Sequence, residues 1–131
     1  MVEAWVREWT SAYTAHDVDA VVRLDPPAPG FGYRDLQIRP AGRPVREGLK
    51  AFFASMDYYG IELNEVHTSV DGDVGLARGF FTENFREKGR TPEKVLVRFT
   101  QTLKFGPDGW RTRLFHRDVQ AFDQKGKYLR Q

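Results

Sequence analysis

Hydrophobic and polar residues follow two different periods along this chain, and the period changes near Gly60. Before Gly60, apolar residues recur every three or four positions, which is the spacing of one buried helix face. After Gly60, apolar and polar residues alternate singly, which is typical of strands with one buried face. Helices followed by a separate run of strands predict an α+β fold.

Three helices are expected in the first part. The first carries a stripe of Val2, Trp5, Val6, Trp9, Ala12 and Tyr13. Asp17 is a good N-cap for a short second helix, which ends at Asp25 because two prolines follow it. The third is expected from about Pro44, with Gly60 as its C-terminal cap. Its buried stripe is Val45, Leu49, Phe52, Phe53 and Met56.

Strands account for the rest of the chain. A short one is expected at Phe31–Asp35, followed by a meander of four long strands at 61–70, 74–85, 95–105 and 110–122. Asp71-Gly72 is a strong hairpin signal. Gly75 and Gly79 are suited to bends or bulges in these long strands. The pattern predicts a single domain over residues 1–122 and a loose polar tail over 123–131.

Composition narrows the functional classes. The 131 residues contain no cysteine, which excludes disulfides and thiolate chemistry, and 14% are aromatic. Twenty Lys and Arg are interleaved with eighteen Asp and Glu, a pattern that argues against nucleic-acid binding. No apolar run reaches the roughly 20 residues of a membrane span, and no signal peptide is recognisable. We therefore expect a cytoplasmic protein with no membrane partner.

The last predicted strand holds the residues that most suggest chemistry. Strict alternation places His116 and Asp118 on one face with Trp110, Thr112, Leu114 and Gln120. A carboxylate beside a histidine can orient it as a general acid or base. The same pair is also compatible with a structural role or a dimer surface. His67 shares an alternating face with Ile61, Leu63, Glu65 and Ser69, and either lines the pocket or is an ordinary sheet histidine. No zinc-type ligand spacing occurs, so no metal site is expected.

Four segments are similar to the nuclear transport factor 2-like superfamily, in particular its SnoaL-like and ketosteroid isomerase-like group. They are WTSAYTAHDVDAVVRL, FGYRD, RPVREGLKAFFASM and DGWRTRLFHRD. The resemblance implies a cone-shaped fold. Three N-terminal helices would pack in the concave face of a long, strongly curved, mainly antiparallel sheet, leaving a pocket open at one end.

The resemblance also implies site residues. Isomerase-like members abstract a proton with a carboxylate of the short strand, the place of Asp35, next to Tyr33. The oxyanion-hole positions of those enzymes correspond to Trp9 and Gln101, which do not reproduce the hole although their N–H groups can donate. Dehydratase- and cyclase-like members use late-strand histidine and aspartate, which points to His116 with Asp118.

Two functions therefore stay open. One is a cofactor-free isomerase, dehydratase or cyclase, in which Asp35 or His116 moves a proton on a small apolar or aromatic molecule. The other is a non-catalytic ligand-binding or dimerisation module. The expected pocket lining is Trp9, Tyr13, Tyr33, Phe53, Met56, Phe99, Gln101 and Leu114. If the odd-numbered residues around Phe99 face the pocket, Arg98 and Thr100 cover the outside of the sheet, through which superfamily members commonly form homodimers.

Overall fold

The structure is a computed structural model that describes residues 1–24, 30–31, 38–39 and 45–131. Its helices are α1 (Val2–Thr14), α2 (Val18–Leu24) and α3 (Val45–Ala54). Its strands are β1 (Gly30–Phe31), β2 (Ile38–Arg39), β3 (Met56–Asp71), β4 (Val74–Glu87), β5 (Glu93–Gly106), β6 (Gly109–Asp123) and β7 (Tyr128–Arg130). The predicted site residues Tyr33 and Asp35 lie outside the described residues.

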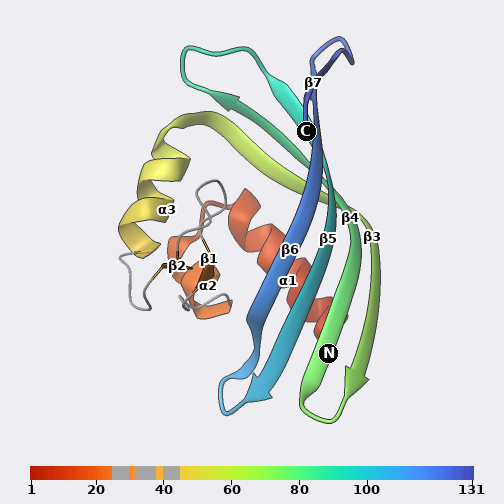
Figure 1. The fold of residues 1–131 in the computed structure, drawn as a ribbon. Helices are drawn as coiled ribbons and strands as arrows, with labels where there is room; N and C mark the ends of the chain where they lie inside the picture. Colours follow the sequence, from red (N-terminus) through yellow and green to blue (C-terminus); the bar gives the residue numbers. More distant parts are fainter. Residues whose placement is uncertain (25–29, 32–37, 40–44) are drawn as a thin grey trace.

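The main sheet is antiparallel, with the strand order β3-β4-β5-β6-β7, and β1 and β2 form a separate small pair. Figure 1 shows the long strands curling around the helices, with α1 lying along the concave face. This arrangement confirms the predicted α+β fold, with a sheet that is curled but not closed. No helix in the described ranges is long and apolar enough to cross a membrane.

The core lies between α1 and the concave face. Val2, Val6 and Trp9 of α1 are buried, and the inward residues of β4 and β5 that complete this core are Ala77, Phe81, Val97, Phe99 and Leu103. The helix stripe and the strand alternation that define these positions are both visible in the sequence. Burial of such apolar surface contributes about 25 cal/mol per Å².

Gly72 and the acidic N-cap Asp17 act as the sequence suggested, whereas the pairing of β4 runs through Gly75 without a bulge. The backbone N–H of Ala20 donates to Asp17 Oδ1 at 3.1 Å, so Asp17 does cap α2. A Cβ added at Gly75 would lie 2.8 Å from Val2 Cγ2, which shows how closely the start of α1 approaches β4. Gly72 has a φ of 61° in the β3–β4 turn, as the Asp71-Gly72 signal predicts.

The prediction for the end of the third helix was wrong. The helix stops at Ala54, and both Met56 and Gly60 belong to β3 rather than to a helix stripe and its cap. Ser55 closes the last turn, since its N–H donates to Ala51 O at 3.0 Å. Pairing with β4 then extends the chain, because Tyr59 and its neighbours are strand formers with a partner strand available.

The polar tail also departs from expectation. Residues 128–130 form a fifth strand, in which Tyr128 pairs with Phe122 of β6. The two rings meet edge to face with their centroids 5.9 Å apart. This contact, together with the turn that Asp123 Oδ1 supports by accepting from the N–H groups of Lys125 and Lys127, orders the tail.

Bulges change the direction of side chains in the long strands, and two of them decide where the predicted site residues point. In β6 the pairing with β5 slips at Arg113, because Thr112 pairs with Leu103 while Leu114 pairs with Thr102. In β3 it slips at Asn64, since Leu63 pairs with Phe81 and Glu65 with Phe80. An extra residue in one strand reverses the alternation that follows it.

Candidate functional site

A carboxylate is buried on the concave side of the sheet. Glu83 lies on β4 between Phe81 and Phe85, the inward neighbours along the strand, and only 6% of its surface is exposed. Arg117 of β6 donates from Nη1 to Glu83 Oε1 at 3.0 Å, and the hydroxyl of Tyr59 on β3 donates to Oε2. Each carboxylate oxygen therefore has a donor, which a buried charge requires. We call Tyr59, Glu83 and Arg117 the interior network.

The surroundings of Tyr59 keep its hydroxyl protonated. Burial raises the pKa of the Tyr59 hydroxyl far above its ordinary value, and the negative charge of Glu83 raises that pKa further. Tyr59 is consequently a neutral donor at physiological pH. Arg117 supplies the positive charge that offsets the carboxylate, and its side chain is one-third exposed.

Aromatic rings surround the Tyr59 side of the network. The ring centroid of Tyr59 lies 5.2 Å from that of Phe52, 6.3 Å from that of Phe85 and 6.4 Å from that of Tyr13. Three of these four rings come from α3 and the β3–β4 pair, which the curl of the sheet brings together. Packing on several sides holds the Tyr59 hydroxyl against Glu83.

A cavity of about 240 Å³ adjoins the network and is called the interior cavity below. It is lined by Phe52, Met56, Tyr59, Glu83, Phe85, Glu87, Val95, Arg117, Val119, Ala121 and Arg130. An apolar cavity of roughly 150 Å³ is enough to hold benzene. The interior cavity is therefore large enough for a molecule built on one aromatic ring.

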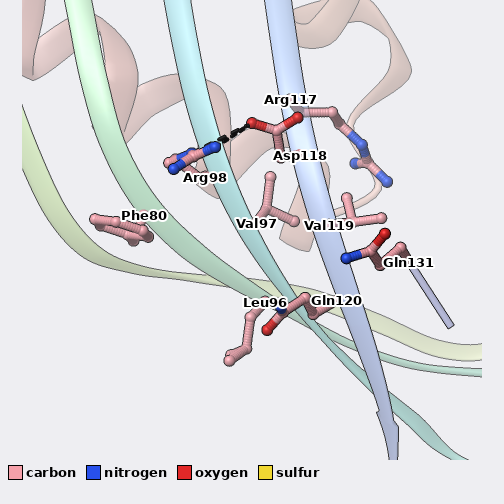
Figure 2. Close-up of a pocket in the computed structure, with 9 residues that line it drawn as sticks. All are labelled: Phe80, Leu96, Val97, Arg98, Arg117, Asp118, Val119, Gln120 and Gln131. Carbon is pink, nitrogen blue, oxygen red and sulfur yellow. Dashed lines mark hydrogen bonds and ion pairs between the residues drawn. The ribbon is translucent and has the colours of Figure 1, made fainter. Parts of the chain in front are cut away.

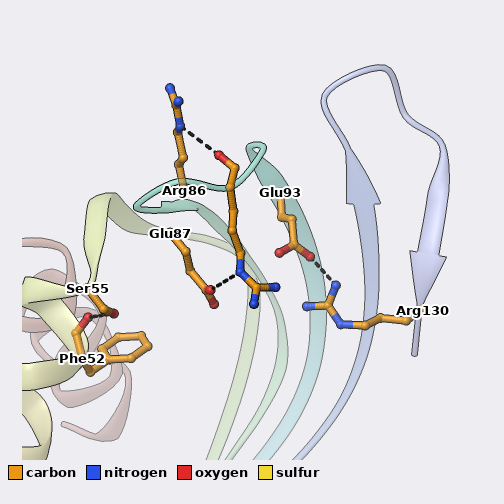
Figure 3. Close-up of polar contacts among 7 residues, drawn as sticks. Phe52, Ser55, Arg86, Glu87, Glu93 and Arg130 are labelled. Atoms are coloured by element: carbon orange, nitrogen blue, oxygen red, sulfur yellow. Dashed lines mark hydrogen bonds and ion pairs between the residues drawn. The ribbon is translucent and has the colours of Figure 1, made fainter.

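Ion pairs border this cavity at the end of the sheet. Arg130 of β7 reaches across to Glu93 of β5 (Figure 3). Arg90 Nε lies 3.2 Å from Glu87 Oε2. Both arginines are more than half exposed. The charged lining residues Glu87 and Arg130 are thus on the solvent side, and the aromatic lining is toward α3.

The predicted lining residues divide between the interior and the outside. Trp9, Phe53, Met56 and Phe99 are buried on the helix side, and Met56 lines the interior cavity. Leu114 does not share this side, because it is 66% exposed on the outer face of β6.

Gln101 and two tryptophans leave polar atoms unpaired in the core. Gln101 is fully buried and donates from Nε2 to Thr112 Oγ1 at 3.1 Å. Within the described residues, its Oε1 and the Nε1 atoms of Trp5 and Trp9 have no hydrogen-bond partner. Gln101 therefore already uses a donor within the core, whereas the Trp9 donor has no acceptor among those residues.

The prediction that His116 and Asp118 share one face of the last strand with Thr112 was wrong. The bulge at Arg113 leaves Thr112 buried, yet turns Leu114, His116 and Asp118 outward. His116 and Asp118 are exposed on the convex face, opposite the helices, while Arg117 between them points inward. A catalytic role for His116 and Asp118 stays a prediction, and in this chain it would have to operate from the outer face.

Asp118 pairs with an arginine rather than with the histidine. Arg98 of β5 donates from Nη2 to Asp118 Oδ2 at 2.7 Å and from Nε at 3.2 Å. These hydrogen bonds lower the pKa of the Asp118 carboxyl below its usual range, with smaller contributions from the charges of Arg98 and His116. Figure 2 shows this pair beside Phe80 and Leu96 in a surface groove of about 550 Å³.

His67 also lies on the outer face. Its Nε2 is 2.6 Å from Glu65 Oε1, and both side chains are about half exposed. The bulge at Asn64 separates this pair from Ile61 and Leu63, which pack toward the core, so the alternating face expected for these residues is also interrupted. Among the described residues, no group of three or more metal-ligating side chains converges.

Sequence reasoning missed Glu83 and Arg117. A signal for Glu83 was present, because it occupies the alternate position between Phe81 and Phe85 in FFTENF. A carboxylate in a buried alternating series needs a partner. The partner itself was not readable, since Arg117 is 34 positions away and its face depends on the bulge.

Comparison with known proteins gives a consistent family. A family model described as a SnoaL-like domain matches residues 2–117. The search of curated proteins found no match.

Several solved structures share the fold. A candidate dehydratase of the NTF2-like family from Streptomyces avermitilis is 21% identical, with 88% of this chain and 91% of that chain covered and a TM-score of 0.67. A candidate scytalone dehydratase from Novosphingobium aromaticivorans is 10% identical, with 93% and 84% covered and a TM-score of 0.78. The CaMKII hub of S. rosetta is 17% identical, with 90% and 93% covered and a TM-score of 0.64. At these identities the likeness shows the fold alone.

Proposed function

Because the chain belongs to the SnoaL-like domain family, we propose that it binds a small, mainly apolar or aromatic molecule in the interior cavity and moves a proton on it. The observation that carries this proposal is the buried Glu83, held by Tyr59 and Arg117 beside an aromatic-lined cavity. The reaction class is a cofactor-free isomerisation, dehydration or cyclisation. The names of the dehydratases of similar fold support this class.

The chemistry follows from the charges of the interior network. Glu83, as a carboxylate balanced by Arg117, would accept a proton from a bound ligand and return it at another atom. Once Glu83 holds the proton, the Tyr59 hydroxyl would leave Oε2 and donate, with the remaining N–H groups of Arg117, to an oxygen on which negative charge develops. The rings of Phe52, Tyr59 and Phe85 would pack against the apolar part of the ligand. Asp35 stays a second proposed base, inferred from the family resemblance.

Exchange of carbon-bound hydrogen tests this proposal. With acetophenone as the probe in D₂O, we expect the wild-type protein to speed the loss of the methyl protons, followed by proton NMR. Glu83→Gln should slow that exchange by at least about 100-fold, the usual contribution of a general base. Ala121→Leu is the matched variant, because Ala121 lines the cavity without belonging to the network, and a larger side chain there should exclude the probe.

The outcomes separate the two functions. Binding of acetophenone, seen as amide shifts at Tyr59, Phe85 and Val119, without any exchange would favour a non-catalytic binding module. Exchange that persists in Glu83→Gln would exclude Glu83 as the base and leave Asp35 or His116 to be tested. The absence of any shift at the cavity residues would contradict the use of this cavity.

A second function is favoured by the outer face of the sheet. We propose that two copies associate there as a homodimer. Leu76, Phe80, Leu96 and Leu114 are all exposed on this convex face, at 38%, 46%, 42% and 66% of their surfaces. An apolar patch between charged side chains is typical of an interaction surface. The CaMKII hub of similar fold supports an assembly role for such a domain.

A further inference from the structure

Two rows of side chains cross the outer face of the sheet at right angles to the strands. The register places His67 of β3, Arg78 of β4, Thr100 of β5 and His116 of β6 in one row. It places Glu65, Phe80, Arg98 and Asp118 in the adjacent row. We call these the central rows. His67 and His116 therefore lie at opposite ends of the first row, and each is close to a carboxylate of its own strand.

The charges of the central rows balance only while both histidines are neutral. Arg78 and Arg98 offset Glu65 and Asp118, which leaves a net charge of zero. Protonation of His67 and His116 would bring the net charge to two positive charges on each copy. Histidine is the side chain that changes charge between about pH 5 and 8.

The contacts within the rows show which charges are available to a partner. Asp118 is held by Arg98 at 2.7 Å, and Glu65 contacts His67 at 2.6 Å. Arg78 makes no ion pair within the described part of the chain. When His67 is neutral, Glu65 can pair with a cation of another copy. When His67 is protonated, it forms an ion pair with Glu65 within the same copy, and Glu65 is then not available to the partner.

The surroundings of the two histidines contain few other charges. His67 faces Arg78 across β3–β4 and Glu65 along β3, and β3 is an edge strand. His116 faces uncharged Thr100, with Asp118 along β6 and Arg98 diagonal to it on β5. The pairing of β7 with β6 is confined to the region of Ala121 and Phe122, and so does not reach His116.

We infer that the central rows form a pH-sensitive contact between two copies of this chain, in which protonation of His67 and His116 weakens the association. This inference rests on the homodimer proposed above. While both histidines are neutral, Arg78 of each copy would pair with a carboxylate of the other copy. The apolar Phe80 side chains would contact each other or their neighbours beside these pairs. In acid, both copies would present excess positive charge, and like charges across an interface oppose association.

Sedimentation velocity at constant ionic strength tests the inference on the full chain. We expect the dimer dissociation constant to rise at least about tenfold between about pH 7.5 and about pH 5.5. The double variant His67→Gln, His116→Gln should dimerise with nearly the same dissociation constant at both values. His16→Asn is the matched control, because His16 faces the interior, stacks on Phe53 and has a φ of 56° that asparagine tolerates. Its pH response should equal that of wild type.

Added salt distinguishes repulsion from unfolding. About 0.5 M NaCl at about pH 5.5 should restore part of the lost association, since salt screens exposed charges. A dimer whose dissociation constant is unchanged by acid would overturn the switch while leaving the homodimer in place. A monomer at every pH would overturn the homodimer and the switch together. Neither result bears on ligand binding in the interior cavity.

Discussion

The hydroxyl of Tyr59 satisfies one oxygen of a carboxylate that has almost no access to water. Glu83 Oε2 receives this donor and Oε1 receives Arg117. A buried acceptor that loses its partner costs about 1–3 kcal/mol, more than the hydrogen bond itself contributes. At the residue scale, the stability of the fold should therefore depend on the single hydroxyl oxygen of Tyr59.

We expect Tyr59→Phe to lower the free energy of unfolding by about 1–3 kcal/mol. Urea denaturation at neutral pH measures this change. Tyr58→Phe is the control, because the neighbouring tyrosine is 46% exposed on the opposite side of β3. Equal effects of the two substitutions would show that the hydroxyl of Tyr59 has no special role.

The pH dependence of the same residue has a definite sign. The folded pKa of Tyr59 is raised, so folding favours the protonated phenol. This contribution is complete below the unfolded pKa of about 10 and is lost as the pH rises beyond it. Wild type should therefore lose more stability than Tyr59→Phe in alkaline solution, by the same denaturation measurement.

At the scale of the element, the long strands depend on bulges for their curvature. Gly79 lies opposite Val66, just after the bulge at Asn64. A Cβ at Gly79 would lie 1.9 Å from the carbonyl oxygen of Glu65. This close approach of two backbones explains a glycine within an otherwise regular strand.

We expect Gly79→Ala to destabilise the fold by at least about 2 kcal/mol, since backbone atoms have to move to accept the methyl group. Gly48→Ala is the matched control. A Cβ at Gly48 has nothing within 4 Å, and alanine should stabilise α3 by about 0.5–1 kcal/mol. Thermal unfolding of both variants gives the comparison, and an unchanged melting temperature for Gly79→Ala would contradict the close packing.

At the scale of the whole molecule, the curl of the sheet separates two working surfaces. The concave side encloses the aromatic cluster and the interior cavity, and the convex side carries the central rows. Arg117 and Asp118 are adjacent in sequence yet belong to opposite surfaces. The proposed ligand binding and the proposed association should consequently be separable by mutation.

The double variant Phe80→Arg, Leu96→Arg tests this separation. We expect it to weaken self-association at least about tenfold, because both apolar side chains are exposed and line the same surface groove. Val70→Arg should have little effect, because Val70 is still more exposed, at 56%, but lies near the β3–β4 turn. Light scattering after size exclusion reports the mass. Loss of ligand shifts at Tyr59 in the double variant would argue against independent surfaces.

The sequence by itself determined the class of the fold and most of its elements. The three-to-four spacing of Val2, Trp5, Val6 and Trp9, the cap at Asp17 and the turn at Asp71-Gly72 are local signals, and each is confirmed. The alternation around Phe99 also assigned the two faces of β5 correctly. Local propensity and period are sufficient there because no residue interrupts the pattern.

Only the tertiary structure decided which side chains meet. One extra residue at Arg113 reverses the faces of β6, so His116 and Asp118 lie outside while Arg117 reaches Glu83. A bulge depends on pairing with the neighbouring strand, which a period of two cannot reveal. The candidate site therefore follows from the register of β3, β4 and β6. That register brings Tyr59 and Arg117, which are distant in sequence, to the buried carboxylate of Glu83.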